Sequence, residues 1–240
     1  MKKYKRGYPV AILAGFGEDR AVLWKVFSQV VKPEKTITLN GTRKDPKAIY
    51  SFHESVIDAL RPTLKEGVRS IILSSLPRTN YAQGFLNHVQ DHHAWLVQGP
   101  RKATFSQMTG AATTLPNVTA LTRIPAFSRI IEETTTEETE NLLDLLEKRL
   151  NAPSREVLVL YSLEEIENQI LSPVKPGKPQ SEYLLIADTY LSRSRMRYRV
   201  QRLMQIAANN GIKTRIVSVD SPAGKRLTQL GGMVCILRLS

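Results

Sequence analysis

The sequence predicts an α/β protein built from two domains, residues 1–133 and 134–240. The chain has 240 residues, 42% of them hydrophobic and 23% charged, which is enough apolar side chain to form two small cores. Short apolar runs typical of strands alternate with longer segments whose apolar residues repeat at a helical period. The charge balance also changes after residue 131, close to a polar stretch, Thr134–Thr136, that has the composition of a linker.

The first domain is expected to begin with three strands, over residues 10–14, 20–27 and 35–39. Gly15–Asp19 has the composition of a turn, so the first two strands should form a hairpin. The third strand contains three successive β-branched residues, which favour extended backbone.

A helix is expected over residues 47–66, because its apolar residues keep to one face at a period of 3.6. These residues are Ile49, Phe52, Val56, Ile57, Leu60 and Leu64. Ser70–Ser74 is expected to form a short buried strand. A helix over 81–92 and a strand over 95–98 should follow.

Two capping boxes, Thr135 with Glu138 and Ser162 with Glu165, predict the starts of helices in the second domain. Gly211 is expected just after the end of another helix, where φ is often positive. The expected strands cover 157–160, 183–187, 215–219 and 234–239, and the later helices cover 193–209 and 223–230.

The net charge of +12, from 34 basic and 22 acidic side chains, predicts a polyanionic partner, most simply RNA or DNA. The charge is unevenly distributed. Residues 132–168 carry −8, whereas residues 1–50 carry +7 and residues 191–240 carry +9. A polyanion should therefore contact the two basic ends of the chain.

Composition also excludes several classes of protein. A single cysteine, Cys235, excludes an internal disulfide and a cysteine-based zinc site, and fits a reducing, cytoplasmic setting. No apolar run approaches the roughly 20 residues that span a bilayer. No secretory signal, phosphate-binding loop or dinucleotide fingerprint is present. We expect no membrane association and no cofactor.

The C-terminal part of the chain contains a specific series of motifs. YLLIADTYL at 183–191 leads into an arginine-rich helix, then NNGIKTRIVSV at 209–219 and AGKRLTQLGGMVCILRLS at 223–240. In this order and spacing the motifs resemble the C-terminal domain of Pelota and of the archaeal and eukaryotic class-I peptide chain release factors. VRSIILSSLPRTNYAQGFLNHV at 68–89 and YSLEEIENQI at 161–170 extend the resemblance over most of the chain.

The resemblance implies a fold for each domain. The first would be a ribonuclease-H-like domain with a mixed sheet, like the middle domain of the family. The second would be a smaller three-layer α/β/α domain of the kink-turn-binding ribosomal protein type. The resemblance also implies the ribosome, tRNA or rRNA as partners, and a translational GTPase as a partner of the second domain. Because the chain begins at the middle domain, we expect it not to read stop codons.

The loop at residues 40–46 lies where release factors have the Gly-Gly-Gln motif, whose glutamine positions water on the peptidyl-tRNA ester. Here the sequence is Asn-Gly-Thr-Arg-Lys-Asp-Pro, without a glutamine. Hydrolysis by that mechanism is therefore not expected, and we assign no catalytic residue. The expected function is ribosome rescue or quality control by binding. The alternatives are a peptidyl-tRNA hydrolase that uses another polar residue, a nuclease, and a kink-turn-type RNA-binding adaptor.

Two basic clusters are the candidate RNA- or ribosome-binding sites. The loop cluster consists of Asn40, Gly41, Arg43, Lys44 and Lys47. The helix cluster consists of Arg195, Arg199 and Arg202, whose spacing places three guanidinium groups on one helix face, where they can bind phosphates. The alternative for the loop cluster is an ordinary surface turn. The alternative for the helix cluster is pairing with acidic helices at 137–147 and 164–167.

His88, His92 and His93 lie close together in the sequence. His88 and His92 have the i, i+4 spacing of a metal-binding pair, but the glutamate of a zinc protease motif does not follow His88. We therefore favour histidines at a helix end and predict no metal. The acidic residues of the first domain fall outside its predicted core strands, which argues against a two-metal nuclease.

Overall fold

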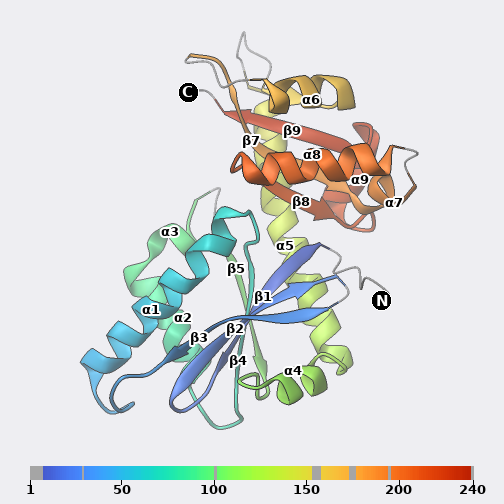
Figure 1. Ribbon diagram of the computed structural model, residues 1–240. Coiled ribbons are helices and arrows are strands. Elements are labelled where there is room, and N and C mark those ends of the chain that lie inside the picture. The colour runs from blue at the N-terminus through green and yellow to red at the C-terminus, as the bar shows by residue number, and fades with distance from the viewer. Residues whose placement is uncertain are drawn as a thin grey trace. The chain divides into compact units, whose positions relative to one another are not determined.

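The computed structural model describes residues 8–28, 30–99, 102–152, 158–172, 177–193 and 196–238. The chain divides at Glu138 into two compact units, each of which is an α/β unit with its own sheet (Figure 1). Among the described residues, no helix is both long and apolar enough to cross a membrane.

The N-terminal unit contains a five-stranded sheet in the order β3-β2-β1-β4-β5. Its strands are β1 (Pro9–Phe16), β2 (Arg20–Phe27), β3 (Val31–Thr38), β4 (Ser70–Ser75) and β5 (Thr104–Thr109). Strand β2 is antiparallel to both of its neighbours, whereas β1, β4 and β5 are parallel. The mixed sheet and the β1–β2 hairpin predicted for this domain are thus confirmed.

Strand β3 lies at one edge of this sheet. Four successive residues in its middle, from Pro33 to Thr36, are exposed, and Lys35 is among them. The pairing of β2 with β3 is irregular near Leu23 and Trp24, so the edge is not a regular ladder.

Helices cover both faces of the N-terminal sheet. One face is covered by α1 (Pro46–Lys65), α2 (Tyr81–His92) and α3 (Ala94–Val97), and the other by α4 (Leu115–Leu121) and the start of α5 (Pro125–Leu150). Strand β1 alternates between the two faces. Ile12 and Phe16 contact the first group of helices, and Leu13 contacts the second.

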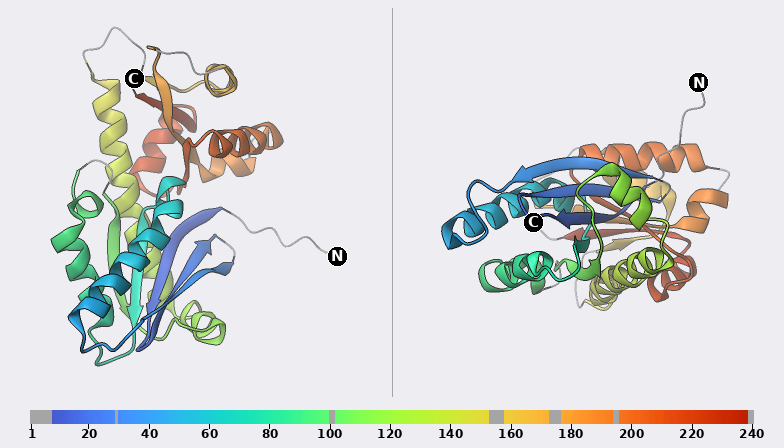
Figure 2. Two further views of the ribbon diagram at one scale, coloured as in Figure 1. Left: turned by 60° about the vertical axis from the view of Figure 1, so that its left-hand side comes forward. Right: turned by 90° about the horizontal axis from the view of Figure 1, so that it is seen from below.

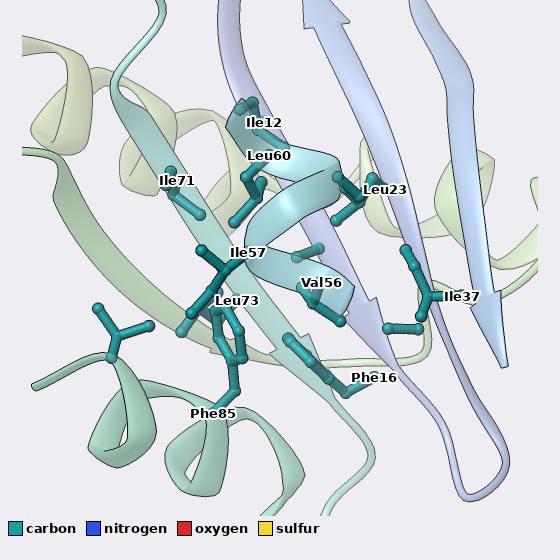
Figure 3. Packing of buried hydrophobic residues seen from close by; sticks show 14 of the residues in the cluster. Ile12, Phe16, Leu23, Ile37, Val56, Ile57, Leu60, Ile71, Leu73 and Phe85 are labelled. Carbon is teal, nitrogen blue, oxygen red and sulfur yellow. The ribbon is translucent and has the colours of Figure 1, made fainter. Parts of the chain in front are cut away.

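The larger of these two cores lies between α1, α2 and the sheet (Figure 3). Val56, Ile57 and Leu60 of α1 lie against the strands, with Phe85 of α2 beside them. All four side chains are at most 1% exposed. Burying a side chain of this size contributes roughly 1.5–3 kcal/mol, so this face of α1 holds the helix on the sheet.

The C-terminal unit contains a four-stranded sheet in the order β6-β9-β7-β8. Its strands are β6 (Val159–Leu160), β7 (Gln180–Ala187), β8 (Lys213–Val217) and β9 (Met233–Arg238). Its shorter helices are α6 (Leu163–Leu171), α7 (Asp188–Arg193), α8 (Arg197–Asn209) and α9 (Pro222–Gln229). Strand β9 is antiparallel to β6 and β7, and β7 is parallel to β8.

Successive residues of β7 point to opposite faces of this sheet and define three layers. Leu184 and Ile186 contact the core formed with α6 and α8. Tyr183 and Leu185 contact the core formed with α9 and the last part of α5. The three-layer α/β/α arrangement predicted for the second domain is confirmed.

Two local predictions in this unit are also confirmed. The Ser162 hydroxyl accepts a hydrogen bond from the Glu165 N–H at 3.2 Å and so caps α6. Gly211 follows the end of α8 with a φ of +72°, a conformation that glycine adopts without steric cost.

The strand predicted over residues 95–98 is wrong. Residues 94–97 form the short helix α3, and the fifth strand of the sheet lies later, at Thr104–Thr109. Leu96 is fully buried in the core between α2 and the sheet. Its burial stabilises the helical conformation of residues 94–97, although their composition is typical of a strand.

The linker and capping box predicted at residues 134–138 are also wrong, because this segment lies inside α5, which Figure 2 shows as one uninterrupted helix. The hydroxyl groups of Thr134 and Thr135 donate to the carbonyls of Ile130 and Ile131, four residues earlier. These threonines therefore satisfy their hydroxyls within the helix instead of interrupting it.

Candidate nucleic-acid interface

The loop cluster lies between β3 and α1. Asp45 precedes the first residue of α1, and its carboxylate accepts a hydrogen bond from the N–H of Lys47 at 2.9 Å. An acidic cap followed by proline is a favourable start for a helix. Gly41 adopts a φ of +124°, so the turn before the cap requires glycine.

Arg43 is used within the protein. Its Nε donates to the carbonyl of Glu18 at 2.9 Å and its Nη2 to the carbonyl of Gly17 at 2.5 Å. Its guanidinium also lies over the ring of Tyr81 at the start of α2, 3.9 Å from the centroid. Burial of the guanidinium lowers the pKa of Arg43 below its usual value.

The remaining members of the loop cluster face solvent. Asn40, Gly41, Lys44 and Lys47 are all exposed, and no ion pair among the described residues includes Lys44 or Lys47. The nearby carboxylate of Asp19 is paired with Arg20, and this hydrogen bond lowers the pKa of Asp19. Lys44 and Lys47 are thus available to an external anion, whereas Arg43 positions the loop.

The arginines of the helix cluster differ in their contacts, although their spacing predicts one shared basic face. Arg199 of α8 forms a two-point ion pair with Glu167 of α6, and its Nε lies 2.6 Å from Oε1. This hydrogen bond raises the pKa of Arg199. The alternative that the arginines pair with the acidic helix at 164–167 is therefore confirmed for this one residue.

Arg202, one turn further along α8, is exposed and belongs to none of the ion pairs of the described residues. Arg195 lies outside the described residues. Next to Arg199, Tyr198 is 72% exposed, with the guanidinium of Arg197 over its ring at 4.9 Å from the centroid. An exposed aromatic ring between arginines offers both stacking and charge to a nucleic acid.

A comparison with known families matches residues 137–240 to eRF1 domain 3, which covers almost the whole C-terminal unit. Among curated proteins, the Pelota homologue of Pyrococcus furiosus is 23% identical over 210 residues, which are 85% of this chain and 53% of that protein. The Pelota homologue of Methanococcus vannielii is 31% identical over 94 residues, or 39% of this chain and 25% of that protein.

The C-terminal unit thus resembles eRF1 domain 3, and most of the chain is similar to a Pelota homologue. The chain spans about half the length, or less, of the two curated Pelota homologues that it matches.

Solved structures of Pelota-type proteins share the fold. A structure of Saccharomyces cerevisiae Dom34 gives a TM-score of 0.51 at 19% identity, covering 95% of this chain and 63% of that one. A model of ribosome-bound archaeal Pelota with ABCE1 gives 0.54 at 18% identity, covering 95% and 61%. Dom34 is described as a translation termination-like factor involved in RNA quality control pathways and interacting with Hbs1.

The helical spacing singled out His88 and His92, and both lie on α2, His92 as its last residue. The structure brings His88 and His93, instead of His88 and His92, to one carboxylate, that of Glu54 on α1. His93 follows the last residue of α2, so its side chain leaves the helix face that the spacing rule describes. No sequence pattern pointed to Glu54, because it lies 34 residues before His88.

Proposed function

We propose that this chain acts in ribosome rescue or translation quality control by binding the ribosome together with tRNA or rRNA. One observation carries the proposal. The C-terminal unit matches eRF1 domain 3, and the similarity to a Pelota homologue extends over 85% of the chain and so includes most of the preceding mixed-sheet unit. The net charge of +12 supports a polyanionic partner.

Both basic clusters would make the contact. The exposed Lys44 and Lys47, on a loop that Arg43 holds in place, would bind backbone phosphates, and Arg202 would do so on α8. Arg195 remains part of this proposal. Arg199 would contribute only when its ion pair with Glu167 is exchanged for a phosphate.

The proposal assigns no hydrolytic step to the chain. The loop from Asn40 to Asp45 contains no glutamine, and its one arginine is engaged with the carbonyls of Gly17 and Glu18. The chain would thus act by occupying a site on the ribosome. A cytoplasmic location and a translational GTPase as the partner of the C-terminal unit belong to the same proposal.

The test is co-sedimentation with ribosomes over a series of salt concentrations. The variants are a loop variant, Lys44→Glu with Lys47→Glu, and two single variants, Arg195→Glu and Arg202→Glu. Binding should weaken as salt increases, and each lost phosphate contact should reduce the slope of log K against log salt by about 1. Lys225→Glu, at an exposed position on α9, makes the same charge change as each single variant and is their matched control.

Binding that weakens in the loop and helix variants but not in Lys225→Glu would support the proposal. Equal weakening by all variants would indicate only non-specific attraction. Absence of binding to ribosomes at physiological salt would reject it, and tight binding to an isolated kink-turn RNA would then favour an RNA adaptor.

A further inference from the structure

A cluster of metal-ligand side chains lies on the side of the N-terminal unit that α1 and α2 cover. It consists of Glu54 on α1, His88 on α2 and His93 just after α2. The Nε2 atoms of His88 and His93 lie 2.8 and 2.7 Å from the same oxygen, Oε1 of Glu54. One ligand atom from each of the three side chains falls within 4.8 Å of the other two.

The surroundings hold these groups in place and leave one side open. His88 and His93 are each 8% exposed, whereas the side chain of Glu54 is 33% exposed and faces solvent. The ring of Tyr50 meets the ring of His88 edge-on, with centroids 4.9 Å apart. The centroid of the buried His53 ring lies 5.0 Å from that of the His88 ring. Fixed ligands with access from the glutamate side are what ion entry requires.

We propose that Glu54, His88 and His93 form a binding site for a divalent transition-metal ion, zinc being the ion whose ligand chemistry fits best. Two imidazoles and one carboxylate are a ligand set that zinc uses, with a fourth position left for water. At zinc–ligand bonds of about 2.0–2.2 Å, neighbouring ligand atoms in a tetrahedral site are roughly 3.3–3.5 Å apart. The two imidazole nitrogens, at 2.8 and 2.7 Å from Oε1 of Glu54, therefore need to move only slightly away from that oxygen to admit the ion.

A hydrogen-bonded His–Glu–His cluster without a metal is the competing explanation. The two explanations predict different contacts for Trp95. The Nε1–H of Trp95 donates to Nδ1 of His93 at 3.3 Å. When Nε2 of His93 binds a metal, the proton of the neutral ring moves to Nδ1, and Nδ1 can no longer accept from Trp95. Metal binding should therefore displace the Trp95 ring, which is 44% exposed.

The experiment uses the untagged 240-residue chain, stripped with a chelator and titrated with Zn²⁺ in competition with a chromophoric chelator. The chain has two tryptophans, so a Trp24→Phe background leaves Trp95 as the single tryptophan reporter. One Zn²⁺ should bind per chain, with a saturable change in Trp95 fluorescence at the same stoichiometry. Glu54→Gln and His93→Ala should each weaken binding by at least about 100-fold.

His92→Ala is the matched control, because His92 is the exposed neighbour that lies outside the three-residue group. It should bind zinc as the parent chain does. Glu54→Gln keeps an oxygen that can accept from both histidines, so it should stay folded, as circular dichroism can verify.

Binding weaker than about 10 µM in the parent chain would overturn the proposal and leave the hydrogen-bonded cluster. Loss of binding in His92→Ala but not in His93→Ala would also overturn it, in favour of the i, i+4 pair. The proposal is independent of ribosome binding, which is measured separately.

Discussion

The guanidinium of Arg43 lies 3.9 Å from the centroid of the Tyr81 ring, and it donates to two carbonyls of the β1–β2 turn. This one side chain therefore connects the loop before α1 to the first strands and to the start of α2. Arg43, which the sequence predicts to bind RNA, thus also stabilises the loop that presents its lysine neighbours.

Arg43→Ala should lower the free energy of unfolding of the N-terminal unit by about 1–3 kcal/mol, because it removes a cation–π contact and two charged hydrogen bonds. Urea unfolding followed by tryptophan fluorescence measures this, since both tryptophans, Trp24 and Trp95, lie in this unit. Lys44→Ala, an exposed neighbour, should change stability by less than about 0.5 kcal/mol. Equal effects of the two substitutions would show that Arg43 does not hold the loop.

Gly15→Ala should destabilise the same unit by about 3 kcal/mol. A methyl group on Gly15 would lie 2.1 Å from the carbonyl oxygen of Ala112, which also accepts a hydrogen bond from the Trp24 indole at 2.7 Å. Gly84→Ala is the control. Gly84 lies inside α2 with nothing within 4 Å of an added methyl group, so alanine should stabilise by about 0.5–1 kcal/mol. Changes of the same sign at both positions would contradict the structure.

The ion pair between Arg199 and Glu167 should contribute a small coupling that salt abolishes. The side chain of Arg199 is half exposed, so water and salt reach the pair, whereas that of Glu167 is 14% exposed. A double-mutant cycle with Arg199→Ala and Glu167→Ala, followed by circular dichroism, should give a favourable coupling at low salt and none near 1 M salt, where the screening length is about 3 Å. A coupling that persists at high salt would mean that the pair is shielded from solvent.

The thiol of Cys235 should be unreactive in the folded chain. Burial raises the pKa of Cys235 to about 11, so the thiolate that reacts is scarce at pH 8. A disulfide reagent should label no thiol in the native protein and one thiol per chain in guanidinium. Rapid labelling of the native chain would show that β9 opens readily.

The sequence predicted best those elements in which local pattern and burial agree. The apolar stripe of residues 47–66 predicted α1, and the serine–glutamate cap predicted the start of α6. The errors occurred where tertiary burial overrides local preference. Residues 95–98 have strand-like composition but turn because Leu96 enters the core, and the true strand at 104–109 has no clear apolar alternation.

The candidate sites were harder to predict, because their contacts join residues that are distant in the chain. Spacing placed Lys44 and Lys47 near each other, but nothing local indicates that Arg43 donates to residues 17 and 18 or stacks on Tyr81. The same holds for Glu54 and His93, which meet only because α1 and the end of α2 lie together on the sheet.

The exposed edge of β3 limits how this protein can associate with others. Pro33 lacks a backbone donor, Lys35 would place its charge beside an added strand, and the β2–β3 ladder is already irregular. A foreign strand would find few regular partners there, so growth of the sheet from one molecule to the next is disfavoured. A partner on this side would therefore have to recognise side chains. The edge of β3 thus protects the protein against polymerising through its exposed strand backbone.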